Sequence, residues 1–272
     1  MITQRFPFLL PLRIAQRKVF FYTGMRFDGR TYAKTKHDAF LAHKLFSTSS
    51  GLYNTKTGFD MVYQENKVFN LKLAAKALNG LCILPGETFS LWKSIRSANR
   101  HTPYRDGLTV TNGKLETQRG GGLCQMSNLL FWVFLHSPLT IVERHAHGAQ
   151  DFPSYRNDEP EGVDATISEG WLDLKVGNET DRTFQIGISF DSENIIGTLF
   201  TDRPMPCHYV IEGRDLSYFE IDGEICQEIS IYRREHDPVS GELLSEYLLY
   251  TNQCVIGYPL PGDTLIIEKR GS

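Results

Sequence analysis

A cysteine that follows three consecutive glycines is the feature of this chain best suited to chemistry. Gly120, Gly121 and Gly122 precede Cys124, and a mostly apolar run without Gly or Pro extends over residues 125–135. Glycine allows positive φ and a close approach of the backbone to a ligand, whereas the apolar run predicts a buried helix. Cys124 would lie at the N-terminus of that helix, where the dipole and free N–H groups favour a thiolate and can hold an oxyanion.

Downstream, two histidines and a glutamate offer the partners that a catalytic thiol needs. Residues 140–143 predict a strand that runs into Glu143-Arg144-His145-Ala146-His147. If this segment stays extended, Glu143, His145 and His147 share one face, because side chains alternate along a strand. A cysteine nucleophile requires a base and a group that orients the base. His145 or His147 is the candidate base, Glu143 the candidate orienting group, and Arg144 a fixed positive charge.

Two other interpretations of the same residues stay open. A buried cysteine is most often a small apolar core residue, and Cys, His and Glu side chains together can bind zinc. The chain has no CxxC or HxxxH pair, and no phosphate-binding loop or dinucleotide-binding motif. We therefore predict no metal site and no organic cofactor, with a metal-stabilised fold as the alternative.

The remaining sequence predicts the elements that position these residues. Helical patterns cover residues 31–46 and 71–78, the second with Asn70 as N-cap and Gly80 beyond its end. Alternating apolar and polar residues predict an antiparallel meander of strands at 164–167, 172–176, 184–190 and 195–200. Further strands are predicted at 208–212, 225–234 and 243–256. These patterns predict an α+β fold, antiparallel and β-rich, with a buried helix after the glycine loop that carries Cys124 and a β-rich C-terminal extension.

Shifts in composition divide the chain into three predicted parts. Residues 1–65 read as a helical or irregular N-terminal segment and residues 66–201 as the core domain. The proline-containing stretch 202–206 then introduces the β-rich extension, residues 202–272.

Charge and cysteine usage exclude some function classes. The formal net charge is −3 and no basic face is evident, which argues against nucleic acid as a partner. The five cysteines are scattered without paired spacing, so no disulfide framework is predicted and a reducing compartment is favoured.

The N-terminal segment combines basic and apolar side chains. Its apolar stretch, residues 6–12, is interrupted by Pro7 and Pro11 and flanked by Arg5 and Arg13. This stretch is too short for a secretory signal or a membrane span, which predicts a cytoplasmic protein. Contact of this segment with a membrane surface is one alternative, and a strand or loop packed on the core is another.

Several motifs carry a family resemblance. They are the runs GGGLCQMSN (120–128) and ERHAH (143–147), together with segments 84–90, 107–110, 163–167, 172–175 and 178–180. With these motifs the chain resembles the VanW family, strongly over residues 66–190 and more weakly along its whole length. Many members have a Ser-Thr pair where this chain has Ser127-Asn128.

The resemblance implies a role in glycopeptide resistance and supplies candidate roles for single residues. Longer relatives are linked to L,D-transpeptidation of peptidoglycan, in which a thiolate attacks a peptide carbonyl. Cys124 would then be the nucleophile, and Asp164, within a family motif, could orient a histidine or bond local backbone. The candidate substrate-binding residues are Gly120, Gly121, Gly122, Gln125, Ser127, Arg144, Tyr104 and Arg105.

Two hypotheses about function follow. In the first, the chain is a cysteine-dependent acyl transferase that acts on peptidoglycan peptides or their precursors. In the second, it is a non-catalytic accessory protein whose glycine loop binds a wall precursor or a partner protein, and a serine at position 124 would leave that binding intact.

Overall fold

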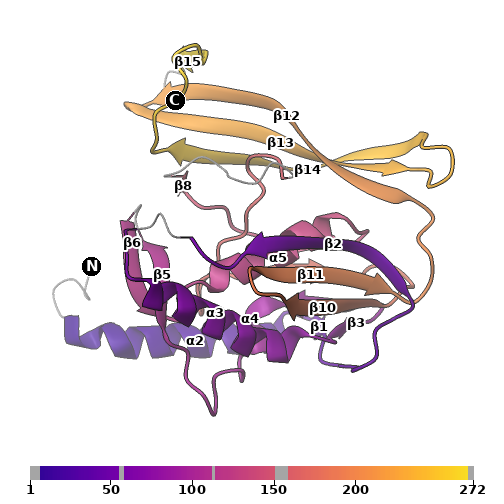
Figure 1. Ribbon diagram of the computed structural model, residues 1–272, viewed down its shortest axis with the longest axis horizontal. Coiled ribbons are helices and arrows are strands. Elements are labelled where there is room, and N and C mark those ends of the chain that lie inside the picture. Colours follow the sequence, from indigo (N-terminus) through magenta and orange to yellow (C-terminus); the bar gives the residue numbers. More distant parts are fainter. Residues whose placement is uncertain (1–6, 55–57, 112–113, 151–158, 269–272) are drawn as a thin grey trace.

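Helix α5 (Leu123–Leu135) lies at the centre of the fold. The computed structural model describes residues 7–54, 58–111, 114–150 and 159–268. Ten of the residues in α5 are buried, including Met126, Leu129 and Phe131. A helix that is apolar on every side must be enclosed by other elements, and Figure 1 shows sheets and helices around α5. The predicted buried helix after the glycine loop is confirmed, as is the α+β, β-rich fold class.

One antiparallel sheet packs directly on α5. Its order is β2 (His43–Gly51), β11 (Asn194–Thr201), β10 (Phe184–Phe190) and β3 (Cys82–Ile83). The predicted strands at 184–190 and 195–200 are confirmed as the hairpin β10–β11. The helix predicted over residues 31–46 is wrong, because His43 to Gly51 pair along β11. Pairing with a sheet edge outweighs a loose helical pattern, since strand preference depends on neighbouring strands.

Helix α3 (Met61–Leu78) packs against α5, and both elements supply residues to the main core. Asp60 caps the helix N-terminus by accepting a hydrogen bond from the Val62 N–H (3.0 Å). The prediction of Asn70 as N-cap is therefore wrong. Asn70 is fully buried within the helix, and its amide bonds the backbone of Arg105 and Gly121.

A second small sheet lies on the other side of the core. Its order is β1 (Thr31–Tyr32), β4 (Glu87–Ser90), β9 (Lys175–Gly177) and β7 (Thr140–Glu143), and the short helix α4 (Leu91–Ile95) follows β4. The predicted strand at 140–143 is confirmed as β7. The four-strand meander is wrong: residues 164–167 form no strand, and β9 pairs with β4 and β7 rather than with β10.

A two-stranded hairpin, β5 (Asp106–Thr111) and β6 (Lys114–Arg119), leads into the glycine turn and α5. Gly107 on β5 and Gly121 in the turn approach so closely that a Cβ on Gly121 would lie 2.2 Å from the Gly107 carbonyl oxygen. The turn is thereby held against the hairpin.

The C-terminal strands form a separate layer above α5 (Figure 1). The sheet order is β15 (Ile266–Glu268), β12 (His208–Ile221), β13 (Glu224–His236), β14 (Leu243–Ile256) and β8 (Ala149–Gln150). The strands predicted within 208–256 are confirmed. Ile211, Ile229 and Ile231 join the main core, and Arg233 donates a hydrogen bond to the Ser137 carbonyl (2.5 Å) just beyond α5.

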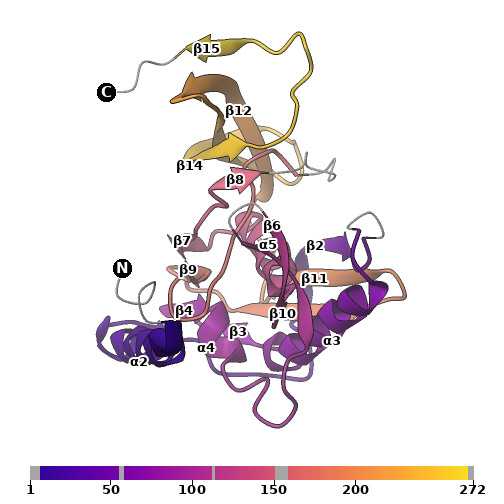
Figure 2. The same cartoon turned by 90° about the vertical axis from the view of Figure 1, so that its left-hand side faces the viewer.

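Residues 7–27 of the N-terminal segment are helical, not the strand or loop considered as an alternative. A turn of 3-10 helix, η1 (Pro7–Leu9), leads into α2 (Leu10–Phe27). Figure 2 shows α2 lying along the outside of the body. The predicted boundaries at residues 65 and 201 stay predictions, although α3 runs across the first of them and β2 belongs to a sheet of the core.

Candidate functional site

Cys124 lines a cavity of about 610 Å³ at the N-terminal end of α5. Gly120, Gly121 and Gly122 line this cavity, together with residues 167–169, Trp171 and Leu172. Residues of α2 and of the β5–β6 hairpin contribute further to the lining. The cavity therefore brings the predicted glycine loop and cysteine together with two segments that are distant in the chain.

The three glycines are required by local geometry. Gly120 and Gly122 have φ angles of 80° and 91°, in the left-handed region that other residues rarely adopt. A Cβ on Gly122 would lie 2.1 Å from Cγ of Lys67, and a Cβ on Gly121 would overlap Gly107. The loop is thus a tightly packed turn that fixes the direction from which α5 begins.

The thiol of Cys124 does not have the environment expected at a helix N-terminus. Burial raises its pKa, and backbone hydrogen bonding at Ile167 only partly opposes that effect. When protonated, the thiol can donate to the Ile167 carbonyl oxygen, 4.0 Å from Sγ. The nearby charge of Asp164 acts in the same direction as burial, because a negative charge disfavours a thiolate. The expected lowering of the thiol pKa is therefore wrong, since desolvation outweighs the helix dipole.

His145 pairs with Glu143, although the segment does not stay extended beyond Glu143 and the expected shared face with His147 is wrong. Its Nε2 lies 3.0 Å from Oε1 of Glu143. The Glu143 carboxylate also accepts hydrogen bonds from Lys175 Nζ (2.7 Å) and the Asp173 N–H (3.0 Å). Burial raises the pKa of Glu143, but Lys175 and these hydrogen bonds outweigh that effect and hold the pKa below its usual value.

His147 pairs with a different carboxylate, that of Asp164. Oδ2 of Asp164 lies 2.5 Å from His147 Nδ1 and 2.7 Å from its backbone N–H, while Oδ1 pairs with the Arg144 guanidinium. Strand β7 ends at Glu143. The chain beyond it is irregular, which lets Arg144 and His147 both reach Asp164. The arrangement fits the hypothesis that Asp164 orients a histidine.

The cysteine and the histidines do not form a hydrogen-bonded dyad. Among the residues that the structure describes, no hydrogen bond joins the Cys124 thiol to His145 or His147, and neither histidine lines the cavity. The structure therefore contains two carboxylate–histidine pairs and a separate cavity lined by a thiol of raised pKa, rather than an assembled catalytic triad.

The predicted substrate-binding residues outside the glycine loop divide into two groups. Tyr104 lines the cavity, and its buried hydroxyl has no hydrogen-bond partner among the described residues. Burial raises the pKa of Tyr104 to about 12. The side chains of the others are occupied elsewhere: Arg105 lies over the Phe69 ring, and Gln125 donates to the Gly51 carbonyl (2.6 Å).

Ser127 and Arg144 also have structural partners. Oγ of Ser127 lies 2.5 Å from the Ala165 carbonyl oxygen, and Arg144 donates to the backbone carbonyls of Gly162 (2.9 Å) and Asp164 (2.6 Å). Ser127 thereby ties segment 162–165 to α5, and Arg144 ties the same segment to the chain after β7.

Sequence reasoning missed the basic and aromatic residues of the cavity. Arg17 and Lys18 reach it from α2, Arg119 from β6, and Trp92 and Trp171 flank it. Arg17 stacks over the Trp171 ring at 4.1 Å, and Lys18 pairs with Glu169. The basic and aromatic content of residues 13–21 was the only available signal, because the partners of these residues lie far away in sequence.

Over the described part of the chain, no group of three or more His, Cys, Asp or Glu side chains is arranged to hold a metal ion. The five cysteines are free. The predictions that the protein uses no metal and no organic cofactor stay predictions. No described helix is both long and apolar enough to cross a membrane.

Fold and site define an α+β protein in which a glycine-rich turn presents a cysteine to a cavity. The family model described as "VanW like protein" matches residues 66–200. The chain is 58% identical over 269 residues, 99% of its length and 98% of the relative's, to the "Vancomycin B-type resistance protein VanW" of Enterococcus faecalis. It therefore belongs to the VanW family.

A more distant similarity covers only part of the chain. The "Uncharacterized protein YoaR" of Bacillus subtilis is 30% identical over 137 residues, which are 50% of this chain and 44% of that protein. No solved structure matches the chain.

Proposed function

We propose that the protein takes part in vancomycin resistance by binding a peptidoglycan precursor in the cavity beside the glycine turn. The observation that carries this proposal is the lining of the cavity, which includes the cations Arg17, Lys18 and Arg119, the rings of Trp92 and Trp171, and Glu169 paired with Lys18. Cations and backbone N–H groups suit the carboxylate and phosphate groups of a muropeptide precursor, and aromatic rings suit its apolar and sugar faces. The similarity to the Enterococcus resistance protein supports the biological setting.

Binding agrees better than catalysis with the state of Cys124. A thiol whose pKa is raised by burial, with no imidazole bonded to it, is a poor nucleophile at neutral pH. The same thiol is a suitable small side chain at the wall of a binding cavity.

The test measures the affinity of a nucleotide-linked muramyl pentapeptide by isothermal titration calorimetry. Arg119→Gln, which removes a cation from the cavity, is expected to weaken binding about tenfold, the usual effect of losing one charge-assisted hydrogen bond. Lys44→Gln is the matched control, because Lys44 is also exposed and lies on β2, outside the cavity lining. Cys124→Ser is expected to leave the affinity unchanged. Absence of binding, or equal losses in the two charge variants, would exclude the proposal.

The second candidate is cysteine-dependent acyl transfer, favoured by the position of Cys124 at the start of α5 and inside the cavity. In this reaction the Sγ thiolate attacks a peptide carbonyl, a thioester forms, the C–N bond breaks, and the departing amine takes a proton. An acceptor amine then attacks the thioester and restores the thiol. His147, held by Asp164, is the candidate base after a rearrangement that brings it to the thiol.

Mass spectrometry separates the two candidates. Incubation with the muramyl pentapeptide, followed by acid quenching, would yield a covalent adduct on the Cys124 peptide if acyl transfer occurs. The binding proposal expects no adduct in the unsubstituted protein. An adduct that disappears in both Cys124→Ser and His147→Ala would establish the enzyme instead.

The expected cytoplasmic location belongs to the same proposal. A protein in the cytoplasm would meet nucleotide-linked or lipid-linked precursors rather than cross-linked wall. Fractionation of cells that produce the native chain, with immunoblotting of each fraction, tests this location. Recovery of the protein outside the membrane would contradict it.

A further inference from the structure

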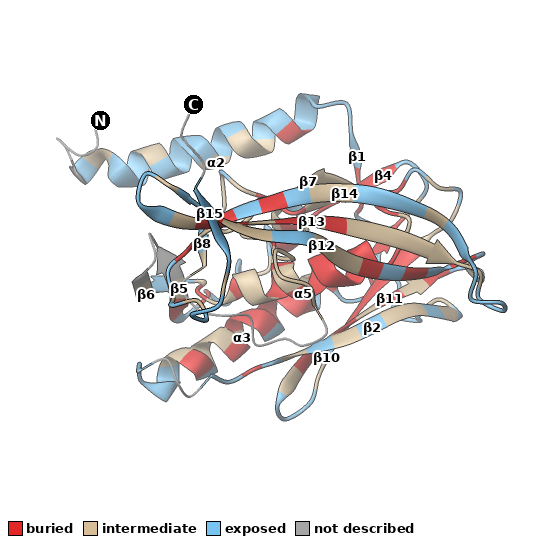
Figure 3. Cartoon of the chain, turned by 90° about the horizontal axis from the view of Figure 1, so that it is seen from above, coloured by how far each residue is buried: buried red, intermediate tan, exposed pale blue. Residues whose placement is uncertain are grey.

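Helix α2 carries large apolar side chains on two opposite faces. At about 100° per residue, Met25 points toward the body and is buried, while Leu12, Val19, Phe20 and Phe27 fall within an arc of about 100° on the other side, where only Gln16 and Thr23 are polar. These four side chains are 67%, 63%, 65% and 81% exposed. Figure 3 shows α2 as an almost entirely exposed rod along one edge of the molecule. Large apolar side chains exposed together on one face indicate a surface that a membrane or another molecule covers.

The inner face shows that α2 has a defined place on the body. The Tyr22 hydroxyl bonds Oε1 of Glu169 (3.0 Å), Lys18 pairs with the same carboxylate, and Arg17 stacks on Trp171. These contacts fix the rotation of the helix about its axis. The outward direction of the second apolar face is therefore set by the fold.

The charges of α2 indicate what covers this face. The helix carries Arg13, Arg17, Lys18 and Arg26 and no acidic residue. Neither Arg13 nor Arg26 forms an ion pair with any described residue. A helix with an apolar face bordered by cations lies in the interface of an anionic bilayer, because the apolar side chains enter the acyl boundary and the cations remain among lipid phosphates.

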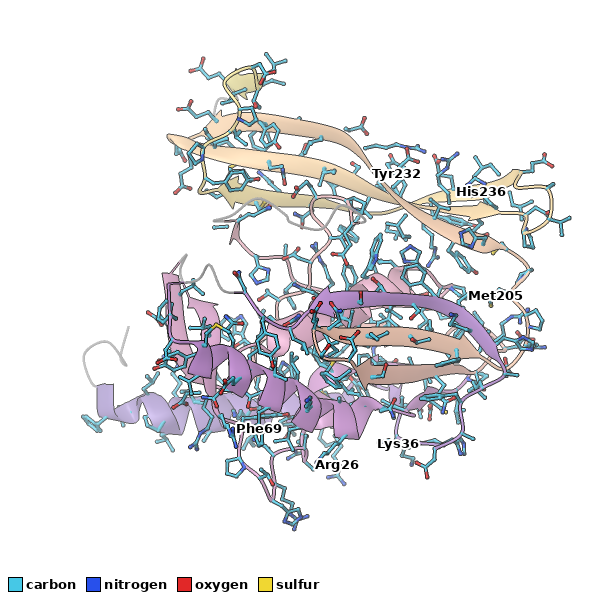
Figure 4. All side chains as sticks on the ribbon, viewed as in Figure 1. Arg26, Lys36, Phe69, Met205, Tyr232 and His236 are labelled. Atoms are coloured by element: carbon cyan, nitrogen blue, oxygen red, sulfur yellow. The ribbon has the colours of Figure 1, made fainter. Side chains whose placement is uncertain are left out.

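We propose that the outer face of α2 docks the protein on an anionic lipid membrane surface. The exposed apolar residues of β14 do not suit the same role, because Glu246 stands among them beside Leu244 and Leu248. Figure 4 shows Arg26 on the side of the molecule opposite Tyr232 of the C-terminal sheet. Docking through α2 therefore leaves that sheet facing away from the lipid.

Docking has a consequence for the cavity. Ile14, Arg17 and Lys18 line it from the inner face of the same helix, so the cavity would lie about one helix diameter, ~10 Å, from the lipid headgroups. The soluble part of a lipid-linked precursor could then reach the cavity while its lipid tail stays in the membrane. This consequence rests on the proposed function, whereas docking itself does not.

The test is co-sedimentation of the full chain with vesicles, in the absence of any muropeptide. Vesicles of equal parts phosphatidylglycerol and phosphatidylcholine are expected to bind the protein, and pure phosphatidylcholine vesicles to bind at least tenfold less. The double substitution Val19→Ser with Phe20→Ser is expected to reduce binding at least tenfold. The matched control is Leu244→Ser with Leu248→Ser, which removes side chains that are 55% and 54% exposed on β14 and is expected to change nothing.

Two further measurements keep the outcome unambiguous. Circular dichroism establishes that each variant is folded, and Phe27→Ser at the helix end replaces the double variant if that variant unfolds. Equal binding of all variants, or no binding to anionic vesicles by the unsubstituted protein, would overturn the proposal. A dimer that ultracentrifugation detects and that the α2 variant abolishes, without vesicle binding, would assign the face to a second copy of the chain. Loss of muropeptide affinity with intact vesicle binding would reject only the proposed function.

Discussion

At the scale of single residues, burial decides the chemistry of the site more than the helix dipole does. The thiol of Cys124 is partly buried among the residues around the start of α5, and this burial raises its pKa. Transfer of an ionisable group out of water disfavours its charged form, whether thiolate or carboxylate. The two histidines instead meet carboxylates, which bond them and fix their ring orientation.

The reactivity of Cys124 follows from this balance. The rate of alkylation by iodoacetamide is measured against pH by mass spectrometry of the Cys124 peptide. The pH at which this rate is half-maximal is expected to lie above the pKa of a free cysteine thiol, which is ~8.5. His145→Ala and His147→Ala are expected to leave the midpoint unchanged, because neither ring bonds the thiol. A midpoint below that of glutathione, raised by loss of one histidine, would contradict this prediction and favour acyl transfer.

Asp173 gives the protein a specific dependence of stability on pH. Burial raises the pKa of Asp173 to about 6, despite hydrogen bonds from Ser90 and the Trp92 N–H. The folded state therefore keeps its proton at pH values where the unfolded chain has released it. Binding of this proton stabilises the folded state, and the stabilisation is fully present below about pH 4. It is lost as pH rises through about 6, which lowers the free energy of unfolding by roughly 3 kcal/mol.

Asp173→Asn tests that contribution. The amide oxygen can still accept from the backbone, and the Ser90 hydroxyl can accept from the new NH₂ group, so the fold is expected to survive. Urea unfolding at several pH values should show a smaller fall in the free energy of unfolding between pH 4 and 7 than in the unsubstituted protein. Identical pH profiles would rule out the raised pKa.

At the scale of elements, the glycine turn acts as the joint between α5 and the β5–β6 hairpin. Gly122 combines a positive φ with close contact to Lys67 of α3. Gly86 has a similar φ of 77°, but nothing lies within 4 Å of its Cβ position. The two positions allow backbone strain to be separated from steric overlap.

Substitution by alanine at each position makes that separation measurable. Gly86→Ala is expected to cost about 1–2 kcal/mol of the free energy of unfolding, through strain alone. Gly122→Ala is expected to cost about 1–3 kcal/mol more, because the new methyl overlaps the Lys67 chain. Combining Gly122→Ala with Lys67→Ala should recover that excess in a double-mutant cycle. Equal losses in the free energy of unfolding at the two positions would show that the Lys67 side chain moves aside without a measurable cost.

At the scale of the whole molecule, the C-terminal sheet is fixed to the body by one face of β13. Ile229 and Ile231 enter the core, and the Arg233 guanidinium bonds the carbonyls of Ser137 and Leu139 after α5. The neighbouring Arg234 points to the other face, where it pairs with carboxylates of its own sheet.

The two adjacent arginines provide a matched pair of variants. Arg233→Gln is expected to lower the free energy of unfolding by about 1.5–3 kcal/mol, because it removes charge-assisted hydrogen bonds between two layers. Arg234→Gln, which removes ion pairs that remain partly exposed, is expected to cost less than about 1 kcal/mol. Urea denaturation compares them. A greater loss in Arg234→Gln would show that the sheet depends on its own ion pairs more than on its contact with α5.

Elements whose pattern is local could be predicted from the amino-acid sequence. The apolar run of α5, the β10–β11 hairpin and the three C-terminal strands are each specified by side-chain periodicity within one segment. The glycine turn before Cys124 was also evident, because only glycine fits its backbone angles. The family resemblance lay in the same local motifs.

Only the tertiary structure decided which distant segments meet. The strand at residues 43–51 exists because β11 offers an edge to pair with, and the cavity exists because α2 and segment 167–172 lie beside the glycine turn. The raised pKa of Cys124 and the separate carboxylate partners of His145 and His147 depend on burial and on contacts across the chain. Periodicity carries no information on such contacts, because they are set by packing between elements rather than by spacing within one.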